Sequence, residues 1–259
     1  MAKVEKGFLA DVVRPFDAFF VFVGEITFLF LDALKRLFTS RFEVKETLNQ
    51  MAFVGVNSIP IVVLTGFFSG AVLSLYISTF LLKYGATSFV GATVALAMTR
   101  EIGPVLAGIM VAARCGSAMA AQIGTMAVTE QVDALKMLSV HPTNYLVVPR
   151  VVASVLMLPI LGLACMWAGS FGGWLVATNE GVPSGAYLTS VNQYTQLSDL
   201  LGGMYKTPVF GLIVALVACQ QGMRTKNGAV GVGRATTNSV VISMVLVYVT
   251  NFILARFMS

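Results

Sequence analysis

The sequence predicts an all-α integral membrane protein with about five transmembrane helices. Three observations support this: 57% of the 259 residues are hydrophobic, only 11% are charged, and several apolar runs are about 20 residues long, the length that spans a bilayer as a helix. A soluble domain carries roughly 25% charged residues. The few charges here could not cover the surface of a soluble core, and the mean hydropathy of +0.83 agrees with a membrane protein.

The first expected element is an amphipathic helix over residues 12–38. Its charged residues recur on one narrow helical face. They are Arg14, Asp17, Glu25, Asp32 and Lys35. We expect this helix to lie in the cytoplasmic interface with the charged face towards water. A sixth, tilted span is the alternative, and it would require partners for Glu25 and Asp32 within the membrane.

Five apolar spans are expected after this helix. They cover residues 51–82, 89–113, 151–178, 208–223 and 240–257, and the fourth can extend back to Leu200. The connections are short, so we divide the chain into an N-terminal cytoplasmic segment with the interfacial helix (residues 1–45) and a transmembrane domain (residues 46–259). The glycine-rich stretch 228–237 lacks the lysine of a phosphate-binding loop and is interpreted as a flexible cytoplasmic turn.

The net charge of +5 follows from topology rather than from nucleic-acid binding. Lysine and arginine are concentrated before the first span, between the second and third, and between the fourth and fifth. This alternation is the positive-inside pattern, and it places the N-terminus in the cytoplasm and the C-terminus outside. Five spans in one small chain enclose little space, so we expect a homodimer to form the pathway.

Small residues recur every four positions in three of the spans. The sets are Gly66 and Gly70; Gly108, Ala112, Gly116, Ala120 and Gly124; and Gly169 and Gly173. Such faces allow helices to approach closely in lipid. A tightly packed monomer and a dimer seam explain them equally well.

No residue pattern indicates catalysis. The single histidine, His141, lies in a loop without an evident serine or cysteine partner, and the three cysteines are too scattered for a metal site or a disulfide framework. We therefore expect no catalytic residue, metal or cofactor in this chain, and no ATP hydrolysis by the chain alone.

Two adjacent charges interrupt the second span. Arg100 and Glu101 are followed by Pro104, which removes the helical hydrogen bond to the carbonyl of Arg100 and frees it for a ligand or water. Because a charge within the membrane costs about 3 kcal/mol on insertion scales, either the two residues form a buried structural pair or they face a cavity. Lys206 could help to hold an anionic headgroup or could extend to the interface. Asn251 is a polar residue in the last span, and such a residue usually forms an interhelical hydrogen bond.

A short amphipathic helix is expected between the second and third spans. Val128, Val132, Leu135 and Leu138 form its apolar face. It either rests on the cytoplasmic membrane surface or docks a cytoplasmic partner.

Read together, these residues resemble the MlaE permease family of ABC transporters, which includes permeases of Mce systems and a plant chloroplast lipid permease. The matching stretches are ALAMTREIGPVLAGIMVAARCGSAMAAQIGTMAVTEQVDALKMLSVHP, MYKTPVF and GVGRATTNSVV. The resemblance covers the chain from about Met51 to its end. It implies a homodimeric, multi-pass permease of the bacterial inner membrane that moves phospholipid between the inner and outer membranes. It also implies an ABC ATPase subunit (MlaF-like) that binds ATP and Mg, and an MCE-domain protein (MlaD-like) on the periplasmic side.

The resemblance also implies roles for individual residues. Arg100, Glu101 and Lys206 match polar residues near the family's lipid pocket, and Tyr84 matches a tyrosine at its outer end. Asn251 departs from the pattern, because an acid stands there in a family member, so this position offers Lys206 no carboxylate. The ATPase-coupling helix is matched by Glu130, Gln131, Asp133, Ala134 and Met137.

Two other functions fit parts of the sequence. An ion-coupled secondary transporter could use Glu101 as a protonation site, and a transport assay under a proton gradient would detect it. A lipid-modifying membrane enzyme would require clustered acids or histidines, which the sequence does not offer.

Overall fold

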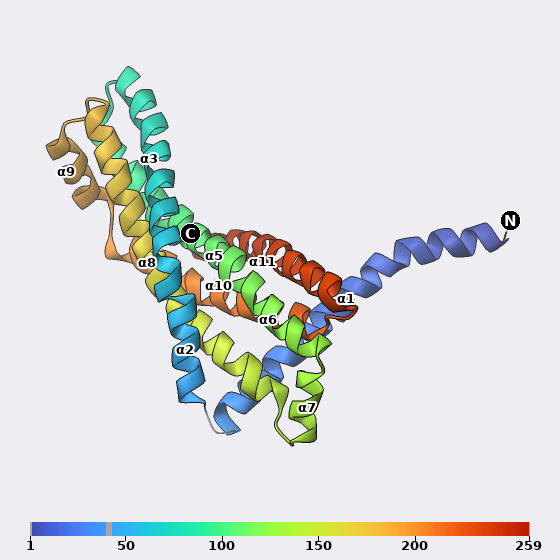
Figure 1. The fold of residues 1–259 in the computed structure, drawn as a ribbon. Helices are drawn as coiled ribbons and strands as arrows, with labels where there is room; N and C mark the ends of the chain where they lie inside the picture. Colours follow the sequence, from blue (N-terminus) through green and yellow to red (C-terminus); the bar gives the residue numbers. More distant parts are fainter. Residues whose placement is uncertain (1, 40–42, 259) are drawn as a thin grey trace.

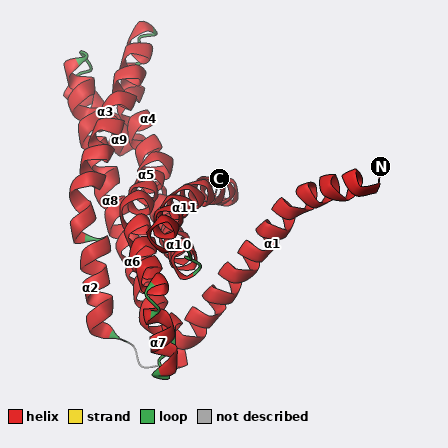
Figure 2. Ribbon diagram, turned by 45° about the vertical axis from the view of Figure 1, so that its right-hand side comes forward, coloured by secondary structure: helices red, strands yellow, loops and turns green. Residues whose placement is uncertain are grey.

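The computed structural model describes residues 2–39 and 43–258, and within these ranges every regular element is helical (Figures 1 and 2). Five segments are long and apolar enough to cross a membrane, which confirms the predicted number. They are Val44–Lys83, Thr87–Val128, Thr143–Asn179, Leu197–Met223 and Gly228–Phe257. Each is longer than expected because the helices continue through polar turns at their ends, where apolar composition no longer marks them.

The first three spans are built from several helical pieces. The first consists of α2 (Val44–Val54), the 3₁₀ turn η1 (Val56–Ser58) and α3 (Ile59–Lys83). The second consists of η2 (Thr87–Phe89), α4 (Val90–Ala97), η3 (Met98–Ile102), α5 (Gly103–Val111), η4 (Ala112–Gly116) and α6 (Ser117–Val128). The third consists of η5 (Thr143–Val147) and α8 (Val148–Asn179). η3, η4 and η5 are single π-helical turns, a feature common at functional sites.

The last two spans are unbroken helices, α10 (Leu197–Met223) and α11 (Gly228–Met258). Two short helices lie outside the spans: α7 (Gln131–Met137) connects the second and third, and α9 (Ser184–Tyr194) connects the third and fourth. Residues 228–237 form the first turns of α11, so the interpretation of this stretch as a flexible turn is wrong. The connection between α10 and α11 is instead residues 224–227, directly before this stretch.

The N-terminal helix α1 (Ala2–Thr39) leaves the bundle as a long arm (Figure 1) and is not among the five spans. Its C-terminal half is anchored by Leu29 and Ala33, which are buried against residues of α6, α8 and α10. Glu25 faces protein as well as water, because it accepts a hydrogen bond from Gln220 at 2.6 Å and lies 3.2 Å from Arg224. The expectation that the whole charged face points only to water is therefore wrong at Glu25, whereas the interfacial location of α1 remains a prediction.

The small residues pack helices within one chain. A Cβ atom on Gly70 would lie 1.9 Å from the carbonyl oxygen of Gly169, so only glycine allows α3 to lie this close to α8. Gly108 and Gly116 contact residues of α10 and α11, and Gly124 contacts Thr225. These close contacts account for the small-residue pattern without a second copy of the chain.

Candidate functional site

The π turn η3 carries the two charged residues of the second span. Pro104 has no N–H, so the carbonyl of Arg100 has no helical donor at that position. Lys206 of α10 donates to this carbonyl at 2.9 Å. The carbonyl therefore accepts from a side chain of the same protein, whereas a ligand or water was expected as its partner.

Lys206, Glu101 and Asn251 form a hydrogen-bonded set from three spans. Lys206 Nζ lies 2.6 Å from Oε1 of Glu101, and Asn251 donates to the other oxygen at 2.8 Å. Lys206 is 3% exposed, whereas the side chain of Glu101 is 43% exposed. Lys206 therefore does not extend to the interface, and Glu101 supplies the carboxylate that position 251 lacks.

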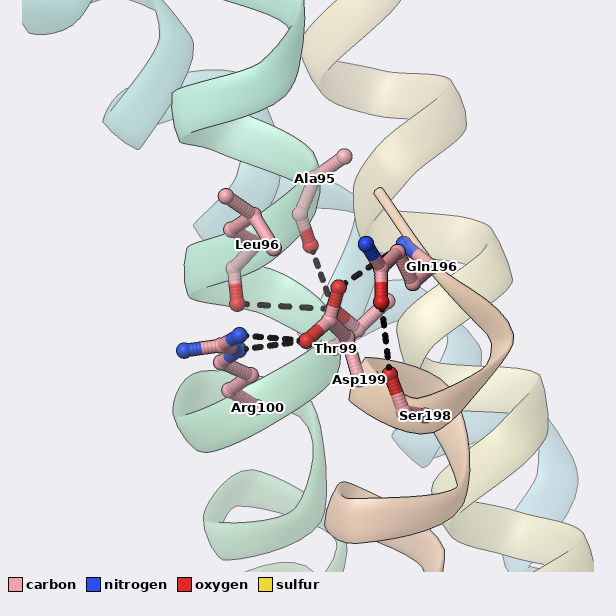
Figure 3. Close-up of polar contacts among 7 residues, drawn as sticks. All are labelled: Ala95, Leu96, Thr99, Arg100, Gln196, Ser198 and Asp199. Atoms are coloured by element: carbon pink, nitrogen blue, oxygen red, sulfur yellow. Dashed lines mark hydrogen bonds and ion pairs between the residues drawn. The ribbon is translucent and has the colours of Figure 1, made fainter. Parts of the chain in front are cut away.

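Arg100 forms a second ion pair, with Asp199 in the first turn of α10 (Figure 3). Its Nε donates to Oδ1 of Asp199 at 2.8 Å, and Nη2 donates to the same oxygen. The other carboxylate oxygen accepts the main-chain N–H of Gln196 at 2.8 Å, as part of a capping box. Asp199 thus fixes both the start of α10 and the guanidinium of Arg100.

Asp199 was missed by the sequence analysis. The signal available was the spacing of Gln196 and Asp199, a polar pair three residues apart immediately before an apolar run, which is typical of a helix start. Its pairing with Arg100, 99 residues away in sequence, depends on the packing of two spans, which the sequence does not specify.

Both ion pairs face one cavity of about 310 Å³. It is lined by Arg100, Glu101, Ser198, Asp199, Gly202, Gly203, Lys206 and Ala255. Gly203 is required here, because a Cβ atom would lie 2.0 Å from the carbonyl oxygen of Thr99 and would force α10 away from η3. Arg100 remains accessible from the cavity, with 60% of its side chain exposed, while Asp199 is 6% exposed.

The cavity can hold a polar, charged group between the spans. Two cations and two carboxylates line it, so its formal charge is balanced before a ligand enters. Within the described part of the chain, no group of three or more His, Cys, Asp or Glu side chains is placed to hold a metal ion. The residues that line the cavity can therefore bind a ligand by ion pairing and hydrogen bonding.

Tyr84 lies apart from this cavity. It follows the last residue of α3, is exposed, and packs its ring against Phe80 with centroids 5.0 Å apart. It is not a lining residue of the cavity in one chain.

The predicted coupling residues are on and beside α7, at the end of the bundle opposite α9 (Figure 1). Glu130 precedes the helix in a left-handed conformation, with φ of 61°, which is uncommon for a residue other than glycine. Gln131, Asp133, Ala134 and Met137 are all exposed, whereas Val132 is buried against the bundle. Leu138, directly after α7, was expected on the apolar face but is also exposed, so Met137 and Leu138 place two large apolar side chains on the surface.

Five spans, balanced charges held between them and an exposed helix on one side define a multi-pass membrane protein with a polar cavity between its spans. Comparison with known proteins identifies the family: the family model described as Permease MlaE matches residues 47–257, so the chain belongs to the MlaE permease family. It is an ABC transporter permease subunit, and the family implies that ATP is hydrolysed by a partner ATPase.

Relatives from distant organisms support this. The chain is 45% identical over 210 residues to a probable ABC transporter permease protein of Rickettsia typhi, covering 81% of each chain. It is 42% identical over 219 residues to a probable ABC transporter permease protein of Synechocystis, covering 84% of this chain and 83% of the relative. It is 35% identical over 223 residues to the chloroplastic protein TRIGALACTOSYLDIACYLGLYCEROL 1 of Arabidopsis thaliana, covering 86% of this chain and 64% of the relative.

Proposed function

We propose that this chain is the permease subunit of an ABC transporter that moves phospholipid between the inner and outer membranes of a bacterium. The observation that carries the proposal is the cavity that Arg100 and Glu101 share with Asp199 and Lys206 inside the membrane spans. Charged residues at this depth are costly unless they are paired or face a polar group. The headgroup of a lipid is a polar group that enters a membrane cavity from the bilayer itself. The name of the Arabidopsis relative, which is that of a diacylglycerol glycolipid, supports a lipid as the cargo.

Arg100 is the residue that we assign to the lipid phosphate. Its Nε and Nη2 are directed to Asp199, and the remaining terminal nitrogen points away from Asp199 (Figure 3). A guanidinium can bind two anions on different edges, because its five N–H donors form a planar fork. Asp199 would therefore hold Arg100 in place while the free edge binds a phosphate oxygen.

Lys206 and Asn251 take a supporting role in this proposal. Lys206 is nearly fully buried, and its ammonium already donates to Glu101 and to the carbonyl of Arg100. With Asn251 on the second oxygen, the carboxylate of Glu101 is fixed in orientation at the cavity wall. Glu101 is then the acceptor that faces the polar part of the lipid.

Two copies would enclose the complete pathway, with the acyl chains against apolar span walls. Tyr84, which lies away from the cavity of one chain, would act at its outer opening in this dimer. Conformational change would reach the cavity from an ABC ATPase subunit bound to α7 through Glu130, Gln131, Asp133, Ala134 and Met137. An MCE-domain protein would bind on the periplasmic side, with the N-terminus of the chain in the cytoplasm and the C-terminus in the periplasm.

The ion-coupled alternative that uses Glu101 is not supported, because ABC permeases are driven by the ATPase of a partner subunit and the chain belongs to such a family.

The test is the phospholipid content of the purified complex. Arg100→Gln removes the charge but keeps a polar side chain, and a charge-assisted hydrogen bond contributes about 1.5–3 kcal/mol, so bound phospholipid at limiting lipid should fall by roughly tenfold or more. Lys83→Gln, at the exposed end of α3, is the matched control and should retain the lipid. Wild-type complex without phospholipid, or equal retention by Arg100→Gln and wild type, would refute the assignment.

A further inference from the structure

A larger cavity lies away from the Arg100–Lys206 set, where the connection between α10 and α11 meets α1. Its volume is about 970 Å³, and it shares no lining residue with the cavity described above. We call it the α1–α11 groove. Its walls are the end of α10, one side of α11 and Phe22 of α1.

One end of the α1–α11 groove is positively charged. Arg224, Lys226 and Arg234 line it, and Arg224 is paired with Glu25 at 3.2 Å. Lys226 and Arg234 are exposed and form no ion pair with another residue in the described ranges. This end therefore has positive charge that the described protein does not neutralise.

The chain holds Lys226 in place by a tight turn. Asn227 and Gly228 both have positive φ, 66° and 63°, which reverses the chain between α10 and α11. Gly231 then allows the turn to lie against the first turn of α11, because a Cβ atom there would be 1.7 Å from the carbonyl oxygen of Lys226. The backbone position of Lys226 at the mouth of the groove is thus set by the turn.

The other end of the groove is apolar. Val241, Val245 and Leu246 line it further along α11, and Val241 and Val245 are exposed. At 1.5 Å per residue, Arg234 and Val245 are separated by about 16 Å along the helix axis. This length is close to half of the roughly 30 Å hydrocarbon core, so the groove passes from charged to apolar over a distance comparable to the thickness of one leaflet.

From this gradient we infer that the α1–α11 groove binds an acidic phospholipid of the cytoplasmic leaflet. The phosphate and its acidic headgroup contact Lys226 and Arg234, and one acyl chain lies along Val241 and Val245. A lipid with net negative charge neutralises the free cations, which a zwitterionic lipid does only in part. A second copy of the chain in a two-fold contact here would bring the same cations towards each other.

The experiment measures thermal unfolding of the purified full chain in neutral detergent, with phosphatidylglycerol or phosphatidylcholine added. Phosphatidylglycerol should raise the unfolding midpoint more than phosphatidylcholine does. The double variant K226Q/R234Q should bind phosphatidylglycerol roughly 30-fold more weakly, because each basic residue near an acidic lipid surface contributes on the order of a fivefold gain. The charge-matched control K35Q/K45Q, which changes two exposed lysines elsewhere, should respond as the wild type does.

Three results would overturn the inference. Equal stabilisation by the two lipids would show that the acidic headgroup is not recognised, and an equal loss in K226Q/R234Q and K35Q/K45Q would show an effect of bulk charge. A disulfide-linked dimer of Val245→Cys would show that a second copy occupies the groove. Since the native cysteines are all buried, such a crosslink would report on position 245.

Arg100→Gln separates this inference from the proposed function. It should keep the difference between the responses to phosphatidylglycerol and phosphatidylcholine, because Arg100 does not line the groove and any phospholipid bound at Arg100 contributes to both responses. Loss of this difference in Arg100→Gln would assign the recognition of the acidic headgroup to the other cavity and would overturn the inference.

Discussion

Lys206 donates both to the carboxylate of Glu101, at 2.6 Å, and to the main-chain carbonyl of Arg100, at 2.9 Å. One buried ammonium therefore satisfies both a side chain and the backbone group that Pro104 leaves without a donor. This links the stability of the second span to α10 and makes Lys206 a structural residue of the site.

Replacement of Lys206 by methionine should destabilise the protein. Removing one partner of a buried pair costs about 3–5 kcal/mol, and the partial exposure of Glu101 reduces this to roughly 2 kcal/mol. The double variant Lys206→Met with Glu101→Gln should recover part of the loss, because no unpaired carboxylate remains. The free energy of unfolding in detergent is the measurement, with Lys83→Met as control, and equal stability of Lys206→Met and wild type would contradict the pairing.

Gly203→Ala should separate α10 from η3. The added Cβ atom meets the carbonyl oxygen of Thr99 at 2.0 Å, and overpacking of this kind costs about 1–3 kcal/mol. Gly185→Ala, on α9 with no atom within 4 Å of the added Cβ, should be neutral or slightly stabilising. Thermal unfolding of the two variants side by side tests the close approach, and similar midpoints would argue against it.

Met137→Asp should weaken binding of the ATPase subunit without altering the fold. Met137 is 87% exposed on α7, so the bundle does not require it, but an added charge would oppose burial at a subunit interface. Pull-down of the ATPase measures the association, and an unchanged unfolding midpoint shows that the chain is intact. Glu180→Lys, exposed at the end of α8, should bind the ATPase normally, and normal binding by Met137→Asp would reject α7 as the docking surface.

Charge reversal at and directly before α7 should also weaken binding of the ATPase subunit. Glu130→Lys with Asp133→Lys should abolish the pull-down, because both carboxylates are exposed where the partner is expected. Loss of Asp133 also removes its ion pair with Lys136 at 2.7 Å, an exposed pair that contributes at most about 1 kcal/mol. Unfolding measurements should therefore show little change, and retained association would contradict the proposed coupling.

Acid should weaken the attachment of α1 to the bundle. Burial opposes ionisation of Asp32, but hydrogen bonds from Thr143 and Arg36, together with the charges of Arg36 and His141, outweigh it and hold the pKa of Asp32 below its usual 3.8. A carboxyl whose pKa is lower in the folded state stabilises the fold above pH 3.8 and loses this contribution as the pH falls below that value. Asp32→Asn should remove this part of the pH dependence of unfolding, and an unchanged acid response would contradict the contacts of Asp32.

The number of spans could be predicted because composition alone identifies a helix that lies in lipid. The ends of the spans could not, since residues 44–50 and 228–239 are helical but polar enough to resemble connections. The position of Arg100 and Glu101 at a deformed turn was anticipated from Pro104. Their partners were not, because the approach of Asp199 and Lys206 depends on how α10 packs against η3. For the small residues, the sequence supported a monomer and a dimer equally, and close contacts within the chain, such as that of Gly70 with Gly169, decide for packing within the chain.

The π turns in the second span affect how it tolerates changes in length. Each π turn accommodates one residue more than an α-helical turn would, and one residue corresponds to about 100° of rotation about the axis. Deleting a single residue from Met98–Ile102 could thus be absorbed by restoring α-helical periodicity, leaving every side chain beyond it correctly oriented while the wide turn itself disappears. The same deletion in α3 would rotate the rest of that helix away from its neighbours. The fold should therefore tolerate the loss of one residue at η3. The same deletion would remove the π turn that directs the side chains of Arg100 and Glu101 into the cavity.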